Sequence, residues 1–551
     1  MDDTGPATRR TFLSGAAVLL ALPAFSVARA AAADGTVVET ADGKLRGAAR
    51  DGVVSFKGVP YAADTSGRNR FMAPRPVAKW AGVRDALAFG DRCPQARRAG
   101  GREIVAPPVP PQGEDCCVLN VYTPGAGRDA ARPVMVYIHG GGFQGGSGDG
   151  ATLDGTALAR GGDVVVVTLN HRLNVFGYAN LGGLDPDFVD AGNAGQLDLI
   201  AALQWVQTNI AAFGGDPHRV TVFGESGGGA KIVALSVMPA ADPLFRNSIN
   251  MSGSGAFFLR PSQELRDPTD ELLRVLGLGK GDLRRLQAVP VARLYAANVT
   301  ALANLKADQL RPVVDGRNII HAPQSAAGWA MQAAKPGIMS CTATEATPWL
   351  LRDRTNLAVT ERELATRIQA QFGIDEARAQ DVIAAYRQDG PKRSAWDVLV
   401  DVASDALMRA PMRKATEARA ATGKQPVYLA GFDWRSPVEN GIWGGPHAID
   451  VPFAFGTLDK DRLTAGGGAR AAAASRNLLA AYVAFATSGT PQNPNMPAWP
   501  AYDLARRPSM LIDETCRVVN DLHAARRQIG ETLAPQSTFD VTNGPLVHPA
   551  A

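Results

Sequence analysis

One serine of the chain lies in a sequence pattern that suits nucleophilic catalysis. Residues 224–228 read G-E-S-G-G, which places Ser226 in a Gly-x-Ser-x-Gly pattern that no other serine of the chain matches. The pattern follows the short apolar run 220–223, so we expect a strand before it and a helix after it. A serine on such a turn has a strained backbone that only small neighbours tolerate, and the helix N-terminus points N–H groups at negative charge. These features indicate a nucleophile, and a plain glycine-rich turn is the alternative.

A second glycine-rich segment could stabilise the oxyanion that acyl transfer creates. Residues 139–143 read H-G-G-G-F and follow the apolar run 134–138. Consecutive glycines can present backbone N–H groups, and a tetrahedral intermediate needs two or three such donors. We expect those donors to be Gly141, Gly142 and Gly227, with His139 structural rather than catalytic. A phosphate-binding loop is disfavoured because neither Gly-Lys-Ser/Thr nor a dinucleotide fingerprint is present.

A general base should follow the nucleophile, since the order serine, acid, histidine is typical of this arrangement. Three histidines leave ample room for an acid in between: His447, His523 and His548. His447 lies in the glycine-rich loop 444–448, which suits delivery of a base to a sheet edge. His523 is close to two arginines and His548 is near the terminus, so both are weaker candidates.

The acid of the site has two candidates. Glu345 closely follows the strand-like run 337–342, and the carboxyl ends of strands are where α/β sites gather. Asp405 lies in a helical context and is the second candidate.

Strands and helices alternate along the chain, which favours a mostly parallel sheet flanked by helices. The helical spacing of Leu199, Leu203, Val206 and Ile210 predicts an amphipathic helix over 194–212. Leu-, Ala-, Arg- and Asp-rich stretches predict helical insertions at about 260–335 and 355–420. Since no repeat or linker is visible, we expect one α/β domain over 31–551. The expected strands are 134–138, 164–169, 220–223, 248–251, 337–342, 427–430 and 510–512.

Composition excludes several classes of protein. The 551 residues are 46% hydrophobic and 20% charged with net charge +4, unlike a disordered chain. The 57 Lys and Arg are nearly balanced by 53 Asp and Glu, which argues against a dedicated nucleic-acid binder.

The first thirty residues are typical of an export signal. Thr-Arg-Arg-Thr-Phe-Leu at 8–13 precedes a mild apolar run, 15–27, and Ala-Arg-Ala at 28–30 offers small residues for cleavage. This layout favours twin-arginine export to the periplasm or the medium, with an ordinary Sec signal as the alternative. The run is shorter than the ~20 residues of a membrane span, and no later segment is long and apolar enough.

The five cysteines suit an oxidising compartment. We expect a disulfide between Cys93 and Cys116, which would close a Pro- and Gly-rich loop and stabilise the protein by roughly 3 kcal/mol. Cys93–Cys117 is an open alternative. No cysteine or histidine spacing suggests zinc.

The chain resembles the type-B carboxylesterase/cholinesterase family, and the resemblance covers nearly all of the expected mature chain. The segments that carry it are F-K-G-V-P-Y-A at 56–62, E-D-C at 114–116, L-N-V at 119–121, H-G-G-G-F at 139–143, N-H-R at 170–172, G-N at 192–193, F-G-G-D-P at 213–217, G-E-S-G-G at 224–228, H-A-I-D-V-P-F at 447–453 and W-P-A-Y at 499–502.

The resemblance implies an α/β-hydrolase fold and a serine esterase that needs neither a metal nor an organic cofactor. Its substrate would be a small carboxylic ester. A catalytically silent adhesion- or ligand-binding relative is the alternative, and the presence of Ser226 argues against it. The residues that the family motifs place in this chain are Ser226, Glu345 and His447 for the triad, Gly141, Gly142 and Gly227 for the oxyanion hole, and Cys93 and Cys116 for the first disulfide.

Two departures from the family pattern concern the site. Gly227 stands where the family usually has alanine, which makes the turn more flexible. Thr344 and Ala346 flank Glu345, where the family usually has aspartate before the acid and glycine after it.

The loop 94–115 gives the only hint of substrate preference. In cholinesterases this loop supplies an aromatic residue that binds quaternary ammonium. Here it contains no Phe, Trp or Tyr but contains Arg97, Arg98 and Arg102. We therefore expect poor selectivity for choline esters. A preference for esters with an anionic portion is a further hypothesis, and a solvated arginine face is its alternative.

Overall fold

The computed structural model describes residues 36–96, 109–253, 259–261, 267–307, 309–390, 392–533 and 545–547. The expected export signal lies outside the described residues, as do His548 and the three arginines of the loop 94–115.

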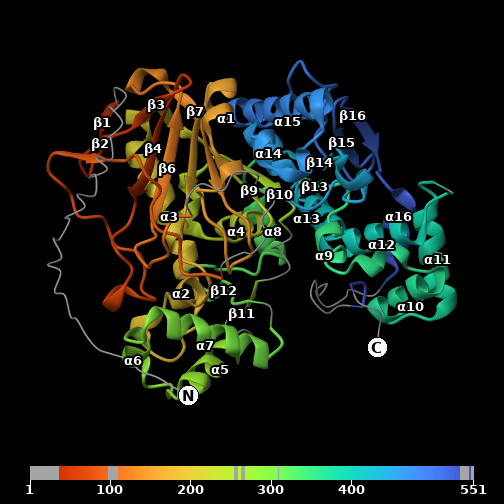
Figure 1. Ribbon diagram of the computed structural model, residues 1–551, viewed down its shortest axis with the longest axis horizontal. Helices are drawn as coiled ribbons and strands as arrows, with labels where there is room; N and C mark the ends of the chain where they lie inside the picture. Colours follow the sequence, from red (N-terminus) through yellow and green to blue (C-terminus); the bar gives the residue numbers. More distant parts are fainter. Residues whose placement is uncertain are drawn as a thin grey trace, which may run out of the picture.

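A large sheet of eleven strands crosses the molecule (Figure 1). All pairings from β15 to β8 are parallel, and the pairings at both edges are antiparallel. The expected parallel centre is therefore confirmed. The strands in spatial order are β16 (Arg517–Asn520), β15 (Pro508–Ile512), β14 (Val427–Phe432), β13 (Gly337–Thr342), β10 (Asn247–Met251), β9 (Gly215–Glu225), β7 (Arg132–Ile138), β8 (Val165–Leu169), β6 (Val118–Thr123), β4 (Val53–Pro60) and β3 (Ala48–Arg50).

Helices cover both faces of this sheet, because its central strands are apolar on both sides. In β7, Val134 and Val136 pack on one face, while Met135 and Tyr137 pack on the other. The first face is covered mainly by α3 (Ala194–Asn209) and α4 (Gly227–Leu235), and the second by α1 (Thr156–Gly162), α14 (Asp450–Phe455) and α15 (Gly468–Ser488). This layering is the α/β-hydrolase arrangement that the resemblance implies.

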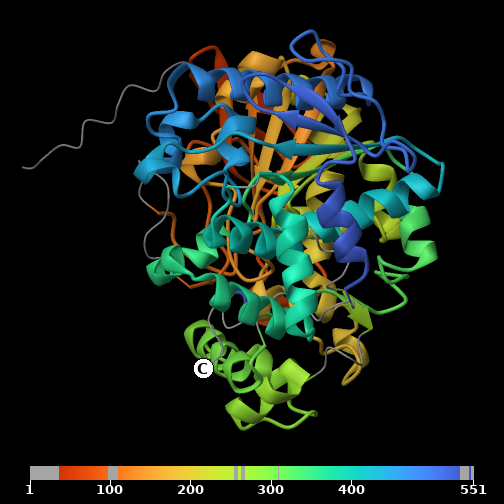
Figure 2. The same cartoon turned by 90° about the vertical axis from the view of Figure 1, so that its right-hand side faces the viewer.

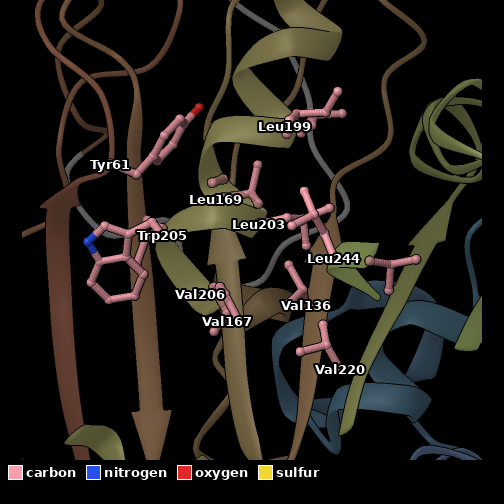
Figure 3. Packing of buried hydrophobic residues seen from close by; sticks show 14 of the residues in the cluster. Tyr61, Val136, Val167, Leu169, Leu199, Leu203, Trp205, Val206, Val220 and Leu244 are labelled. Carbon is pink, nitrogen blue, oxygen red and sulfur yellow. The ribbon is translucent and has the colours of Figure 1, made fainter. Parts of the chain in front are cut away.

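Helix α3 shows how the sheet is covered. Leu199, Leu203 and Val206 lie against Val136 and Val167 of the strands (Figure 3). Most side chains of this helix are buried. The less buried ones recur at helical spacing and include Leu197, Ala201, Gln204 and Thr208. The expected two-sided helix is therefore present, with a narrow outer stripe.

The two expected helical insertions are present. The first contains α5 (Asp267–Leu276), α6 (Leu283–Gln287), α7 (Val291–Asn304) and α8 (Ala326–Gln332). The second contains α10 (Glu361–Phe372), α11 (Glu376–Arg387), α12 (Ala395–Ser404), a π-helical turn (Asp405–Arg409) and α13 (Ala410–Ala421). The short helix α9 (Thr347–Leu350) precedes this insertion. Helices α5–α7 gather at one end of the molecule beside α2 (Asn174–Tyr178), and α10–α12 lie with α16 (Ala524–Glu531) at its side (Figures 1 and 2).

Several short elements escaped the sequence analysis. They are β1 (Val37–Glu39), β2 (Lys44–Arg46) and β5 (Val83–Asp85), which form a three-stranded sheet, and β11 (Arg260–Pro261) and β12 (Val313–Val314), which form a two-stranded one. Runs of two or three residues carry too little periodicity to be recognised. No helix in the described ranges is both long and apolar enough to cross a membrane.

The expected disulfide is not formed. All five cysteines fall in described residues, and each is buried with a free thiol. Cys93 Sγ instead accepts a hydrogen bond from the backbone N–H of Leu173 at 3.2 Å. Cys116 hydrogen-bonds to Cys117, which lowers its pKa, but a hydrogen bond with Cys93 and burial raise the pKa well above its usual value. The thiols of Cys93 and Cys116 are therefore held by burial and hydrogen bonds rather than by a covalent link.

Candidate active site

Four adjacent parallel strands end at the same edge of the sheet and carry the candidate residues. They lie in the order β7, β9, β10 and β13. The glycine-rich segment follows β7, Ser226 follows β9, Ser252 follows β10 and Glu345 follows β13. Because parallel strands share their carboxyl edge, these segments, far apart in sequence, meet there.

Ser226 occupies a sharp turn between β9 and α4. Its backbone has φ 55° and ψ −120°, a strained combination for a residue with a side chain. Its N–H donates to the carbonyl oxygen of Met251 at 2.8 Å. A Cβ atom at position 228 would overlap the carbonyl oxygen of Ile138, and one at position 224 would lie 2.7 Å from it. The glycines of the motif therefore let the elbow approach β7, and the serine is left partly exposed among buried neighbours.

Glu345 and His447 are joined as the sequence analysis expected. Glu345 Oε2 lies 2.6 Å from His447 Nδ1. The other oxygen, Oε1, accepts from Ser252 Oγ at 2.5 Å and from the Thr342 N–H at 2.7 Å. Burial raises the pKa of Glu345, but the imidazole and these hydrogen bonds outweigh it, so the pKa is lowered and the group is an anion. A fully buried carboxylate with these partners has a fixed orientation.

Glu225, which the sequence analysis did not single out, faces the other side of the imidazole. Its Oε1 lies 3.1 Å from His447 Nε2. This brings the outer nitrogen of the ring to the elbow, because Glu225 directly precedes Ser226. Burial lowers the pKa of His447, but the charges of Glu225 and Glu345 raise it to about 9.

Asp450 adds a third carboxyl group behind the imidazole. It is 1% exposed, and neither oxygen of its side chain has a hydrogen-bond partner among the described residues. Burial, followed by the charges of Glu225 and Glu345, raises the pKa of Asp450 well above its usual value. The neutral form of the Asp450 side chain is therefore favoured, which reduces the negative charge around the histidine.

The acid loop is held from behind by the end of α12 and the π-helical turn. Ser404 Oγ accepts from the N–H of Ala346 at 3.0 Å. Arg409 Nη1 donates to the carbonyl oxygen of Ala343 at 2.7 Å. Both neighbours of the Thr344–Glu345 pair are thereby fixed. π-Helical turns are rare and occur preferentially at functional sites.

Asp405 is a structural partner rather than the acid of the site. Its Oδ1 accepts from Arg409 Nε at 2.7 Å. Asp401 also binds Arg409, through Nη2 at 2.9 Å. Asp405 therefore orients the arginine that holds the acid loop, and Glu345 rather than Asp405 lies against Nδ1 of His447.

Three other histidines of the described residues have structural surroundings: His139, His171 and His523. His523, at the start of α16, lies 2.8 Å from Asp389 and does not belong to this edge of the sheet. His139 is buried, and its Nδ1 lies 2.8 Å from the carbonyl oxygen of Gly140. Its ring stacks on His171 with centroids 5.0 Å apart.

The glycine-rich segment 139–143 packs directly against the elbow. Gly141 and Gly142 have φ 89° and 61°, which a residue with a side chain rarely adopts. A Cβ atom at position 227 would lie 2.5 Å from the backbone nitrogen of Gly142. Gly227 thus permits a closer approach than the alanine usual in the family. The N–H of Phe143 donates to Gln309 Oε1 at 2.8 Å, which anchors the far end of the segment.

This fold and edge define a class of protein. A mostly parallel α/β sheet with a strained serine elbow, a glycine loop beside it and a carboxylate-bound histidine is the arrangement of an α/β-hydrolase. The carboxylesterase family model matches residues 34–529, so the chain belongs to the carboxylesterase family. It is a serine hydrolase that acts on carboxylic ester bonds.

Individual relatives agree with this membership. The chain is 32% identical to para-nitrobenzyl esterase of Bacillus subtilis, over 89% of this chain and 98% of that protein. It is 33% identical to phenmedipham hydrolase of Pseudarthrobacter oxydans, over 88% of this chain and 97% of that protein. A crystal structure of a Geobacillus stearothermophilus carboxylesterase at pH 6.2 superposes with a TM-score of 0.78 at 35% identity, covering 90% of this chain and 99% of that one.

Proposed function

We propose that this carboxylesterase is exported and hydrolyses its substrates through an acyl-enzyme on Ser226. The observation that carries the catalytic part of this proposal is the 2.6 Å contact between Glu345 and His447, with the outer nitrogen of the imidazole at the elbow. A histidine oriented by a buried carboxylate beside a strained serine suits general-base activation of the hydroxyl.

Each residue has a defined role in the proposed reaction. Nε2 of His447 accepts the proton of Ser226 as Oγ attacks the ester carbonyl, and then returns a proton to the leaving alcohol. Glu345 holds the tautomer and stabilises the imidazolium. The N–H groups of Gly141, Gly142 and Gly227 bind the oxyanion, where the loss of one donor costs about 3 kcal/mol. Water repeats the attack on the acyl-enzyme and regenerates Ser226.

Hydrolysis of p-nitrophenyl acetate and butyrate by the mature protein and by Ser226→Ala tests this function. We expect the substitution to abolish turnover. Equal activity of both proteins would overturn the assignment of Ser226 as the nucleophile. No activity in either would favour the alternative of a silent adhesion- or ligand-binding relative.

We propose that the alcohol portion of good substrates is neutral rather than a quaternary ammonium. The absence of Phe, Trp and Tyr between residues 94 and 115 supports this, because cation–π binding needs such a ring. Turnover of butyrylcholine should not exceed that of a neutral butyrate ester of similar size. Adding a carboxylate to a matched ester tests the further hypothesis about the three arginines, which fails if turnover never improves.

We propose export by the twin-arginine route, supported by Thr-Arg-Arg-Thr-Phe-Leu at 8–13 ahead of the short apolar run. Residues 1–30 fused to a folded reporter should send it across the inner membrane of a competent bacterium. Replacing Arg9 and Arg10 together with lysine should block this transfer. Unchanged export of that variant would favour the Sec route.

A further inference from the structure

Lys231 is a buried lysine beside the site that the proposed mechanism does not use. It lies on α4, one turn beyond the elbow, and its side chain is inaccessible to solvent. Among the described residues, no carboxylate oxygen lies within 4 Å of Nζ. An unpaired ammonium in the interior costs several kcal/mol. The positive end of the α4 dipole adds to this cost.

The hydrogen bond of this lysine points to the glycine-rich segment. Nζ donates to the carbonyl oxygen of His139 at 2.9 Å. The ammonium also lies 6.0 Å from the ring centre of Phe143, at the other end of the same segment. Lys231 therefore contacts both ends of residues 139–143, the stretch that contains the oxyanion donors.

The remaining supports of the segment converge on the same geometry. Gly227, on the same helix as Lys231, lets Gly142 pack closely against the elbow. Gln309 accepts from the N–H of Phe143 at 2.8 Å. Three contacts thus hold the segment: Lys231 binds it at His139, Gly227 at the start of α4 packs against Gly142, and Gln309 binds it at Phe143.

From this geometry we infer that Lys231 is a positioning residue that holds the oxyanion loop through the His139 carbonyl and places a positive charge beneath it. The inference rests on the proposed acyl-enzyme mechanism. An oxyanion formed at Gly141 and Gly142 would be stabilised by a cation in this low-dielectric interior, more than the neutral ester before it. The lysine would therefore act on the transition state rather than on substrate binding.

The ionisable groups around Lys231 agree with this role. Burial lowers the pKa of Lys231 to about 7, and Glu225 at the end of β9 raises it in part. His139 and His171 face the lysine from the loops after β7 and β8, and burial lowers the pKa of both, so they are neutral. A developing oxyanion favours the charged form of the lysine, because nearby opposite charge raises the pKa of an amine.

Lys231→Met tests the inference, since methionine fills similar space without charge or donor. We expect kcat for p-nitrophenyl butyrate to fall about 10–100-fold with little change in KM. Inhibition by an alkyl trifluoromethyl ketone, which forms an oxyanion adduct with a serine nucleophile, should weaken by a similar factor. If Lys231 merely filled the core, its substitution would change neither kcat nor the inhibition by the ketone. Unchanged kcat and unchanged ketone inhibition would overturn the inference.

Two further variants keep the test clear of folding effects. Lys231→Gln is neutral but retains an amide donor, so it can replace Lys231→Met if that variant folds poorly. We expect both kcat and the affinity for the ketone to fall in Lys231→Gln as well. Lys335→Met is the matched control, because Lys335 Nζ also donates to a backbone carbonyl, that of Asp242, at 2.7 Å away from the site. Its kcat should match that of the wild type. Failure of the ketone to inhibit the wild type would instead overturn the acyl-enzyme mechanism itself, and with it the inference.

Discussion

The Oε1 atom of Glu225 lies 3.1 Å from Nε2 of His447, so the imidazole faces a carboxylate on each of its two nitrogens. One carboxylate suffices to orient the ring, and the second stabilises its protonated form. The arrangement therefore stabilises the imidazolium that proton transfer creates. It also leaves a smaller fraction of His447 neutral, and able to act as a base, at low pH.

The pH dependence of catalysis should reveal this second carboxylate. His447 must be neutral to accept a proton, and its pKa is about 9, so the His447 limb of kcat/KM should rise with pH toward about 9. The loss of the Lys231 proton, whose pKa is about 7, makes this rise shallower without moving the His447 limb. Glu225→Gln removes the negative charge beside Nε2, which lowers the pKa of His447 and moves the rising limb to lower pH. The exposed Glu376→Gln should leave the limb in place. Rising limbs of kcat/KM with midpoints near pH 6.5 in both the wild type and Glu225→Gln would contradict a role of Glu225 in raising the pKa of His447.

Arg409 should matter to catalysis although it lies behind the site. Arg409→Met removes the donor to the Ala343 carbonyl and leaves Asp401 and Asp405 without this partner. Breaking such a buried pair costs about 3–5 kcal/mol of unfolding free energy. If the acid loop then shifts by about 1 Å, kcat falls up to about 100-fold. Kinetics and urea unfolding measure the two effects.

The Ser404→Ala variant separates those two effects. It removes the acceptor for the Ala346 N–H but no charge, so it should cost only about 1–3 kcal/mol. A stable Ser404→Ala protein with lowered kcat and unchanged KM would confirm that the loop behind Glu345 is held for catalysis. Full activity in both variants would show that Glu345 is positioned without them.

Gly227 should be needed for the close approach of the two glycine segments. In Gly227→Ala the new Cβ must displace Gly142, because the atoms it meets are backbone rather than a flexible side chain. We expect kcat to fall by up to about 100-fold, the cost of a misplaced oxyanion donor, with little change in KM. Gly161→Ala in α1 is a control, since a Cβ there meets nothing within 4 Å and its φ is not in the left-handed region. Wild-type kcat in Gly227→Ala would mean that the oxyanion loop does not depend on this contact.

The N-H-R motif at 170–172 should act on stability rather than on catalysis. Arg172 Nη2 lies 2.6 Å from Asp198 Oδ1, and both side chains are at most 2% exposed. Asp198→Asn leaves a buried guanidinium with a weaker partner, so the unfolding free energy should fall by about 3–5 kcal/mol. Asp85→Asn, which breaks an exposed pair with Arg46, should change it little. A chemical denaturation midpoint that moves equally in both variants would contradict this reading.

Much of the fold was visible in the sequence because the central strands are apolar on both faces. The expected strand 337–342 is β13 at both ends, and 164–169 is β8 to within one residue. The serine elbow was equally visible, since its glycines are required by contacts with Ile138. Glu345 could be selected because it follows a recognisable strand.

The supports of the site could not be read from the sequence. Ser252 contacts Glu345 across 93 positions of the chain, and its orientation depends on a positive φ of 51° that no local pattern signals. Arg409 lies in a π-helical turn within what reads as an ordinary helix. Lys231 is one polar residue in an apolar helix, and only the packing of the 139–143 segment above it shows that its charge is buried. Long-range pairing of this kind needs the three-dimensional structure.

Covalent labelling measures the central claim most directly. The mature protein is treated with a fluorophosphonate, and the adduct is located by mass spectrometry of its peptides. A single adduct on Ser226, absent from Ser226→Ala and strongly slowed in His447→Ala, is the predicted result. An adduct on another residue, or continued ester hydrolysis by Ser226→Ala without labelling, would contradict the proposal that Ser226 is the nucleophile.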